Sequence, residues 1–98
     1  MPEEDNQQLH VRVEGRVQGV GFRYFVYDQA LDLGLTGWVR NRFDGSVEVL
    51  AEGKRSVLDQ LMSALRRGPR SSLVLGLHPT WNQATGEYTG FQILPTST

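Results

Sequence analysis

The sequence predicts an α+β fold of the ferredoxin-like type, a split β-α-β sandwich in which two helices cover one face of an antiparallel sheet. Hydrophobic residues recur at every second position in some segments and at spacings of three and four in two others. Turns that contain glycine separate these segments. The resulting order, β-α-β-β-α-β followed by a short strand, is the order of that fold.

The chain has 98 residues, which is enough for one domain. We expect residues 1–8 to form a flexible tail and residues 9–98 to form that domain. A domain of this size has one modest core, since it buries only about 60–70% of the surface that its unfolded chain exposes. A shallow site made of backbone and a few side chains is therefore expected, in place of a deep cofactor pocket.

The first element is a strand and the second a helix. Residues Leu9 to Glu14 alternate between hydrophobic and polar, which is typical of a half-buried strand. The segment Gly15–Gly21 contains three glycines in seven residues and breaks that strand. From Phe22 to Leu33 the hydrophobic residues fall on one stripe of a helix, and Gly34 is expected to end it.

A hairpin and a second helix follow. The segments Thr36–Arg42 and Ser46–Glu52 are rich in strand-forming residues, and the Asp44-Gly45 pair between them is a hairpin turn signal. Ser56 is the expected N-cap of the next helix. The Gly68-Pro69 pair is expected to end that helix.

The last third of the chain predicts a weaker strand over residues 72–81, a polar loop over 82–90 and a short strand over 91–94. Gly76 and Pro79 interrupt the first of these strands. Proline cannot donate a hydrogen bond to a neighbouring strand, so Pro79 indicates an edge strand or a bulge.

Composition excludes several classes of protein. The net charge is −1, from 10 Lys and Arg against 11 Asp and Glu, so the chain lacks the positive charge with which proteins bind a nucleic-acid backbone. Arginines gather in the first half of the domain, however, which favours a local site for a small anionic ligand. No apolar run of about 18 residues predicts a membrane span. The acidic N-terminus lacks the features of a signal peptide, so a cytoplasmic protein is expected.

Metal and cofactor chemistry is not expected. The absence of cysteine excludes disulfides, thiolate metal sites and a cysteine nucleophile. The two histidines, His10 and His78, are far apart in the sequence, and surface or strand-edge positions are expected for both.

The junction between the glycine-rich segment and the first helix indicates an anion site. The start of a helix carries free N–H groups and about half a positive charge, and glycines let the preceding backbone turn several N–H groups toward one anion. Arg23 adds a cation to the first turn, where the helix dipole disfavours one. The alternative is a plain tight turn beside a solvated arginine. Standard nucleotide-binding motifs are absent, because Tyr24 stands where the third glycine of G-x-G-x-x-G would be.

Two long motifs relate the sequence to a known family. The segment Gly15-Arg-Val-Gln-Gly-Val-Gly-Phe-Arg23 resembles the signature of the acylphosphatase family, and the segment from Gly37 to Glu48 resembles its second signature. Ala51-Glu52-Gly53, Gly68-Pro69 and Gly90-Phe91-Gln92-Ile93 occur at the family's usual spacings. The resemblance extends from about Val11 to Ile93. Only the stretch Leu75–Pro79 departs from the family pattern, which leaves the length of that strand open.

The resemblance implies an enzyme that hydrolyses acyl phosphates to a carboxylate and inorganic phosphate without a metal. No cofactor is expected, and a monomer is expected because nothing in the sequence requires more than one copy. The resemblance also implies that Arg23 binds the phosphate and that Asn41 positions the attacking water. The backbone of the segment from Gly15 to Val20 would supply the N–H groups around the phosphate; its members are Gly15, Arg16, Val17, Gln18, Gly19 and Val20. Gln18 could instead hold the loop in shape.

The residue types suit this chemistry independently of the resemblance. A guanidinium binds phosphate oxygens as a planar fork, and an asparagine amide has both a donor and an acceptor with which to orient a water. Asn41 could also simply bond the backbone of the nearby turn.

Two other functions remain as alternatives. A non-catalytic, anion-binding regulatory module would use the same glycine-rich loop without turnover. An RNA-binding domain of the same element order would need aromatic and basic residues on the open sheet face, which Ser46–Glu52 does not supply.

Overall fold

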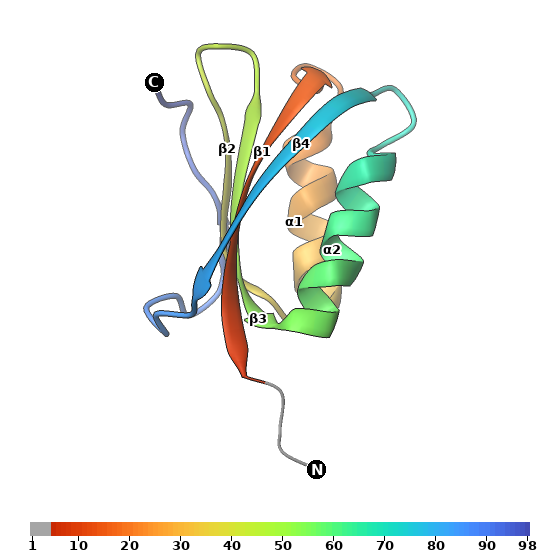
Figure 1. The fold of residues 1–98 in the computed structure, drawn as a ribbon. Helices are drawn as coiled ribbons and strands as arrows, with labels where there is room; N and C mark the ends of the chain where they lie inside the picture. The colour runs from red at the N-terminus through yellow and green to blue at the C-terminus, as the bar shows by residue number, and fades with distance from the viewer. Residues whose placement is uncertain (1–4) are drawn as a thin grey trace.

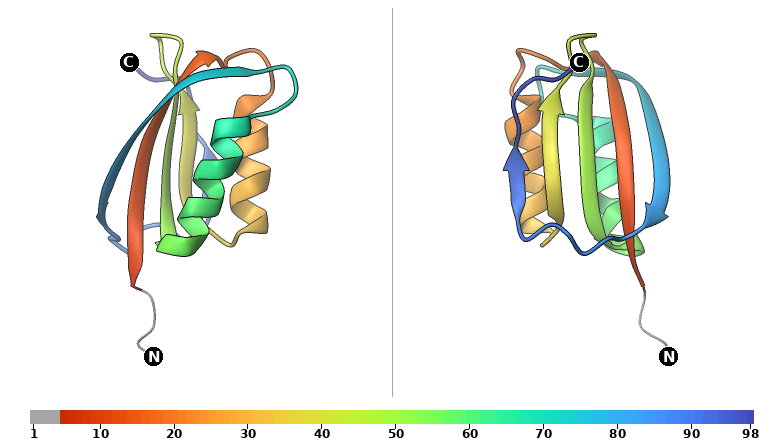
Figure 2. Two further views of the ribbon diagram at one scale, coloured as in Figure 1. Left: turned by 45° about the vertical axis from the view of Figure 1, so that its right-hand side comes forward. Right: turned by 90° about the vertical axis from the view of Figure 1, so that its left-hand side faces the viewer.

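The computed structural model describes residues 5–98 and shows a five-stranded sheet packed against two helices (Figure 1). Both helices cover the same face of the sheet, and the other face is open (Figure 2). The predicted order of elements and the α+β sandwich are confirmed. The elements are β1 (Asn6–Arg16), α1 (Phe22–Asp32), β2 (Thr36–Asn41), β3 (Val47–Lys54), α2 (Arg55–Arg67), β4 (Leu73–Gln83) and β5 (Phe91–Ile93).

The sheet is mixed, with the strand order β4-β1-β3-β2-β5. Strands β1 to β4 pair antiparallel, but β5 runs parallel to β2, with Phe91 opposite Gly37 and Ile93 opposite Val39. The expectation of a purely antiparallel sheet was therefore wrong at β5. Figure 2 shows the physical reason. Strand β4 ends at the same end of the sheet at which β2 begins, and the segment after β4 crosses the sheet at that end. Strand β5 therefore begins beside the start of β2 and runs in the same direction.

Strand β1 begins earlier than the sequence pattern indicates. Residues 6–8 of the expected tail over 1–8 belong to the strand, because β3 extends far enough to pair with them. Gln8 lies opposite Glu52, and its Nε2 donates to Glu52 Oε2 at 2.8 Å. Residues 1–4 of that tail lie outside the described residues.

Helix α2 begins at Arg55, so Ser56 is inside its first turn and the expected N-cap was wrong. Strand β3 continues to Lys54, which occupies the cap position, and the helix follows without a connecting loop. Arg55 Nε donates to Asp59 Oδ1 at 3.2 Å, one turn along the helix. The predicted end is confirmed, since Gly68 is the C-cap with a φ of 64°.

Strand β4 runs two residues further than expected, to Gln83, and continues through Gly76 and Pro79. It lies at the edge of the sheet, as Pro79 indicated. The register with β1 shifts where Glu14 pairs with Gly76 and Gly15 pairs with Val74, which leaves Leu75 without a partner in β1, so β4 contains a bulge beside Gly76. A Cβ atom on Gly15 would collide with the carbonyl oxygen of Leu73, so the position opposite this bulge requires glycine.

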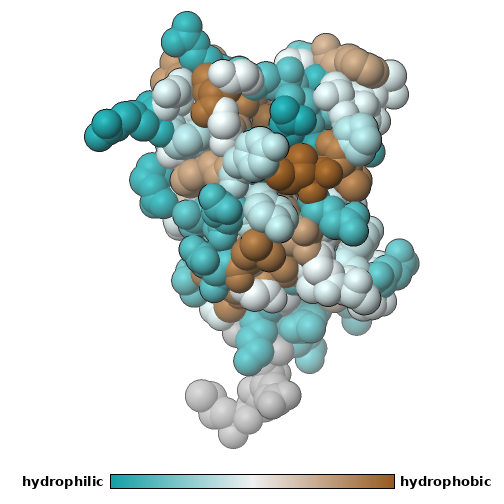
Figure 3. Space-filling model, turned by 180° about the vertical axis from the view of Figure 1, so that it is seen from behind, coloured by the Kyte–Doolittle hydropathy of each residue, from teal (hydrophilic) through white to brown (hydrophobic). Residues whose placement is uncertain are grey.

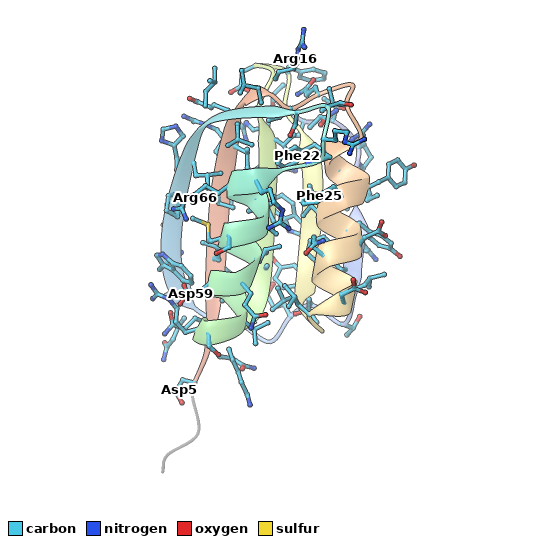
Figure 4. The ribbon with its side chains drawn as sticks, turned by 90° about the vertical axis from the view of Figure 1, so that its right-hand side faces the viewer. Asp5, Arg16, Phe22, Phe25, Asp59 and Arg66 are labelled. Carbon is cyan, nitrogen blue, oxygen red and sulfur yellow. The ribbon has the colours of Figure 1, made fainter. Side chains whose placement is uncertain are left out.

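The hydrophobic core lies between the sheet and the two helices. The inward residues of β1 and β3 follow the strand period of two, and the buried residues of α1 follow the helical period. Figure 4 shows Phe22 and Phe25 at the start of α1, with ring centroids 6.0 Å apart. The fully buried side chains include Leu9, Val11, Val13, Val17, Phe22, Val26, Val39, Val47, Val49, Leu58, Leu61 and Leu65.

On the open face, Glu48 of the central strand β3 is almost fully buried under polar partners. Its carboxylate accepts from Arg40 Nε at 2.7 Å and from Arg42 Nη1 at 3.2 Å, and its Oε2 lies 2.6 Å from His10 Nε2. Burial by itself would raise the pKa of Glu48, but these three partners outweigh it and hold the pKa below its ordinary value. His10 lies on the open face of the interior strand β1, so of the two positions expected for it the surface one is observed and the strand-edge one is not.

We expect Glu48→Gln to lower the free energy of unfolding at pH 7 by about 1–3 kcal/mol, because it removes charged hydrogen bonds from a buried position. The folded-state pKa is depressed, so the contribution of Glu48 is present above the ordinary carboxyl pKa and is lost as the pH falls through the lower folded-state value. The difference between wild type and variant should therefore shrink between pH 7 and pH 3. Urea unfolding across this range measures it, with Glu87→Gln, at an exposed position before β5, as the control expected to change less.

Candidate functional site

A pocket of ≈ 120 Å³ lies where the loop after β1, the first turn of α1 and the end of β2 meet. This volume is about four times the 30 Å³ of a water molecule in the liquid, and well below the roughly 300 Å³ at which pockets for larger ligands begin. The pocket therefore suits a small group. Its lining residues are Val17, Gly19, Gly21, Phe22, Arg23, Tyr24 and Asn41.

The backbone at the start of α1 leaves N–H groups free toward this pocket. Gly19 and Gly21 have φ values of 72° and 79°, a left-handed conformation that glycine adopts without strain. Gly21 is the N-cap, no side chain caps the helix, and its first turn has no acidic residue. The N–H of Phe25 makes the bond to the Gly21 carbonyl at 3.0 Å, so the N–H groups that precede it have no helical acceptor.

Arg23 adds a full positive charge to this helix end. It lies in the first turn of α1, half-buried, and lines the pocket. Within residues 5–98 its guanidinium has no hydrogen bond and no ion pair. A cation beside the positive end of a helix dipole is unfavourable unless an anion lies between them. The combination therefore favours an anionic ligand.

Asn41 faces the same pocket from the end of β2. Every second residue of β2 faces the helices, namely Gly37, Val39 and Asn41. The Asn41 residue is 9% exposed. Its Oδ1 atom is buried and has no hydrogen-bond partner in the described protein, which costs about 1–3 kcal/mol. The Asn41 carbonyl accepts from the Ser97 N–H at 3.0 Å, which holds the backbone in place. An unmet acceptor on a fixed backbone is suited to receive a donor from a bound water.

Gln18 fastens the glycine-rich loop to the β2–β3 hairpin. Its Nε2 donates to the carbonyl of Arg42 at 2.7 Å and to that of Ser46 at 2.8 Å. These contacts support the structural alternative for this side chain, and binding of phosphate by its backbone stays a prediction. The bonds also set the distance between the loop and Asn41, because Asn41 directly precedes Arg42.

Besides Gln18, three residues of the predicted cradle lie outside the pocket: Gly15, Arg16 and Val20. Gly15 and Arg16 are the last residues of β1 and pair with β4. Gly15 lines a separate hollow beside the hairpin turn, and Arg16 projects from the end of the molecule (Figure 4). Val20 packs against the core, and Val17, which does line the pocket, has its side chain buried in the core, so only their backbone is suited to face a ligand.

The structure thus brings together Val17, Gly19, Arg23 and Asn41 out of the predicted set. It adds Gly21, Phe22 and Tyr24, to which the sequence pattern assigned no ligand contact. Gly21 could have been found as part of the same glycine run. Tyr24 could have been found as a large aromatic residue outside the hydrophobic stripe of α1.

We expect Gln18→Glu to destabilise the protein by about 1–3 kcal/mol, because it removes two donors and places a carboxylate against two carbonyl oxygens. Turnover should fall as well, because the loop would no longer be held at its distance from Asn41. Urea unfolding and steady-state kinetics measure the two effects. Gln60→Glu makes the same change on the exposed surface of α2 and should leave both nearly unchanged. Unchanged stability in Gln18→Glu would contradict this role.

Within residues 5–98 no group of three or more histidine, aspartate and glutamate side chains is placed to hold a metal ion. None of the helices described is long and apolar enough to cross a membrane.

Comparison with known proteins identifies a family. Residues 9–93 match the family model described as acylphosphatase. An acylphosphatase of Pelotomaculum thermopropionicum is 48% identical over 86 residues, which cover 88% of this chain and 94% of the relative. An acylphosphatase of Methylococcus capsulatus is 48% identical over 88 residues, covering 90% and 96%. The crystal structure of acylphosphatase from Bacillus subtilis superimposes with a TM-score of 0.87 at 42% identity, covering 90% of this chain and 98% of that one.

Proposed function

The chain belongs to the acylphosphatase family, and from this premise we propose that the pocket at the start of α1 is the active site in which it hydrolyses acyl phosphates. One observation carries the proposal. An unpaired arginine, an uncapped helix start and a buried, unpaired amide oxygen line the same small pocket.

The phosphate group of the substrate is bound first by charge. Arg23 contacts its oxygens through a planar fork, and the free N–H groups at the start of α1 and in the loop Val17–Gly21 contact the remaining oxygens. Phosphoryl transfer spreads negative charge over these oxygens in the transition state. The same donors therefore stabilise the transition state without having to move.

The attacking water is oriented by Asn41. The Oδ1 atom accepts a hydrogen bond from the water, which directs an oxygen lone pair toward the phosphorus. The new bond forms between this oxygen and phosphorus while the bond from phosphorus to the carboxylate oxygen breaks. The carboxylate leaves with the electron pair, and the proton of the water passes to a phosphate oxygen. A separate strong base is not required, because an acyl phosphate has a good leaving group.

The proposed chemistry requires no metal or cofactor. We expect the purified protein to hydrolyse benzoyl phosphate at the same rate with and without a chelator of divalent cations. A continuous absorbance assay measures the loss of substrate. Activity that disappears with chelator and returns with one added metal would contradict the metal-independent mechanism. Binding of inorganic phosphate in a calorimetric titration without any hydrolysis would select the alternative, a regulatory anion-binding module.

We further propose that the protein is a monomer that acts in the cytoplasm on small acyl phosphates and does not bind nucleic acid. The net charge of −1 supports the last point. The face of the molecule drawn in Figure 3 supports the monomer, because the hydrophobic residues on this face form small patches separated by hydrophilic ones. Sedimentation at several concentrations, binding assays with RNA and DNA, and cell fractionation test these three points.

A further inference from the structure

The size of the pocket indicates where the rest of the substrate lies. A volume of ≈ 120 Å³ accommodates a small anion, but it leaves little room for an acyl chain or ring. The pocket is also open at the molecular surface, because it includes the exposed residues Gly19 and Tyr24. With the phosphate held at the start of α1, the acyl group therefore projects over the rim.

Tyr24 is the large apolar side chain on this rim. It directly follows Arg23 in the first turn of α1, lines the pocket and is 66% exposed. It lies outside the core that buries Phe22 and Val26 on the same helix. Among residues 5–98 its side chain has no ring contact and no hydrogen bond. An exposed aromatic ring without partners gives the fold little stability, but it offers a flat apolar surface beside the bound phosphate.

We propose that Tyr24 is a specificity-determining residue that contacts the acyl group and favours acyl phosphates with an aromatic or bulky apolar acyl group over acetyl phosphate. The inference rests on the proposed function, because it takes the pocket as the phosphate site. An aromatic acyl group buries area against the Tyr24 ring and stacks on it, whereas a methyl group covers little of it.

The chain offers a matched control at the same end of the molecule. Phe43, in the β2–β3 turn, is 72% exposed and aromatic like Tyr24, but it does not line the pocket. The turn and the start of α1 both lie at the upper end of the molecule in Figure 1. A general effect of an exposed aromatic residue near the site would appear in both variants, whereas contact with the acyl group should appear in Tyr24 variants alone.

The test measures kcat/KM for benzoyl phosphate and for acetyl phosphate in wild type, Tyr24→Ala, Tyr24→Phe and Phe43→Ala. We expect Tyr24→Ala to lower the benzoyl-to-acetyl ratio about 3- to 10-fold, in line with one aromatic contact. Tyr24→Phe keeps the ring and should stay within about twofold of wild type, as should Phe43→Ala. Thermal unfolding followed by circular dichroism, with a melting temperature close to that of wild type, shows that Tyr24→Ala is folded.

The outcomes separate this inference from the proposed function. A ratio that is unchanged in Tyr24→Ala, or that falls equally in Phe43→Ala, overturns the role of Tyr24 while the enzyme remains active on both substrates. A wild-type protein that hydrolyses neither acyl phosphate overturns the proposed function itself. A ratio that falls in Tyr24→Phe as much as in Tyr24→Ala assigns the effect to the hydroxyl group and overturns the ring contact.

Discussion

Replacing Arg23 with alanine is expected to lower kcat/KM for acyl phosphates about a thousandfold or more. The arginine is the one side chain of the described pocket that carries a formal positive charge. It contacts the phosphate both in the bound substrate and in the transition state, so KM should rise while kcat falls. Mutations that remove comparable donors lower rates by 10² to 10⁵, of which about 10³ is a central value.

The stability of the Arg23→Ala variant should not fall with its activity. Arg23 has no partner among the described residues and lies at the positive end of α1, so alanine removes a repulsion. We expect the melting temperature of Arg23→Ala to be unchanged or higher, which distinguishes lost chemistry from lost folding. Arg23→Lys keeps the charge but not the planar fork and should recover only part of the activity.

Arg66, on the exposed face of α2 in Figure 4, provides the control. Arg66→Ala makes the same substitution at a residue that does not line the pocket and should keep wild-type kinetics. The assignment of the phosphate site would be refuted if Arg23→Ala and Arg66→Ala were equally active.

Replacing Asn41 with alanine is expected to lower kcat about 10²- to 10³-fold with a change in KM of less than about threefold. The amide acts on the water and leaves the phosphate to other groups, so its loss affects the chemical step more than substrate binding. The pattern therefore differs from that of Arg23→Ala, in which KM rises as well. Steady-state kinetics with benzoyl phosphate measure both parameters.

The folded state should tolerate Asn41→Ala. The Oδ1 atom is already buried without a partner, so its removal relieves an unmet hydrogen bond and offsets the loss of packing. Exposed Asn82→Ala, on β4, is the matched control and should leave kcat unchanged. A large rise in KM with unchanged kcat in Asn41→Ala would place this residue in substrate binding and contradict the water-positioning role. Full activity in the Arg23→Ala, Asn41→Ala double variant would exclude both roles.

The sequence alone determined the order of the elements, the two helices on one face and the segment that carries the site. The alternation from Leu9 to Glu14 and the helical spacing from Phe22 onward decide which side chains face the core. Such periodicity depends only on residues that are near one another in the sequence. The glycine-rich segment before α1 predicts a helix start with free N–H groups, and this prediction does not depend on where the helix packs in the fold. These features could be predicted because each depends on residues close together in sequence.

Tertiary structure alone decided which of these residues meet. Asn41 reaches the pocket because β2 pairs with β3 and packs against α1, and Gln18 reaches the hairpin because the loop folds back upon it. The same kind of contact between distant segments places Gly15 opposite the bulge in β4, and the burial of Glu48 beside His10 of β1 and Arg40 of β2 likewise depends on strand order. Strand β5 runs parallel because of where β4 ends. Such contacts join residues that are far apart in sequence, and no local periodicity specifies them.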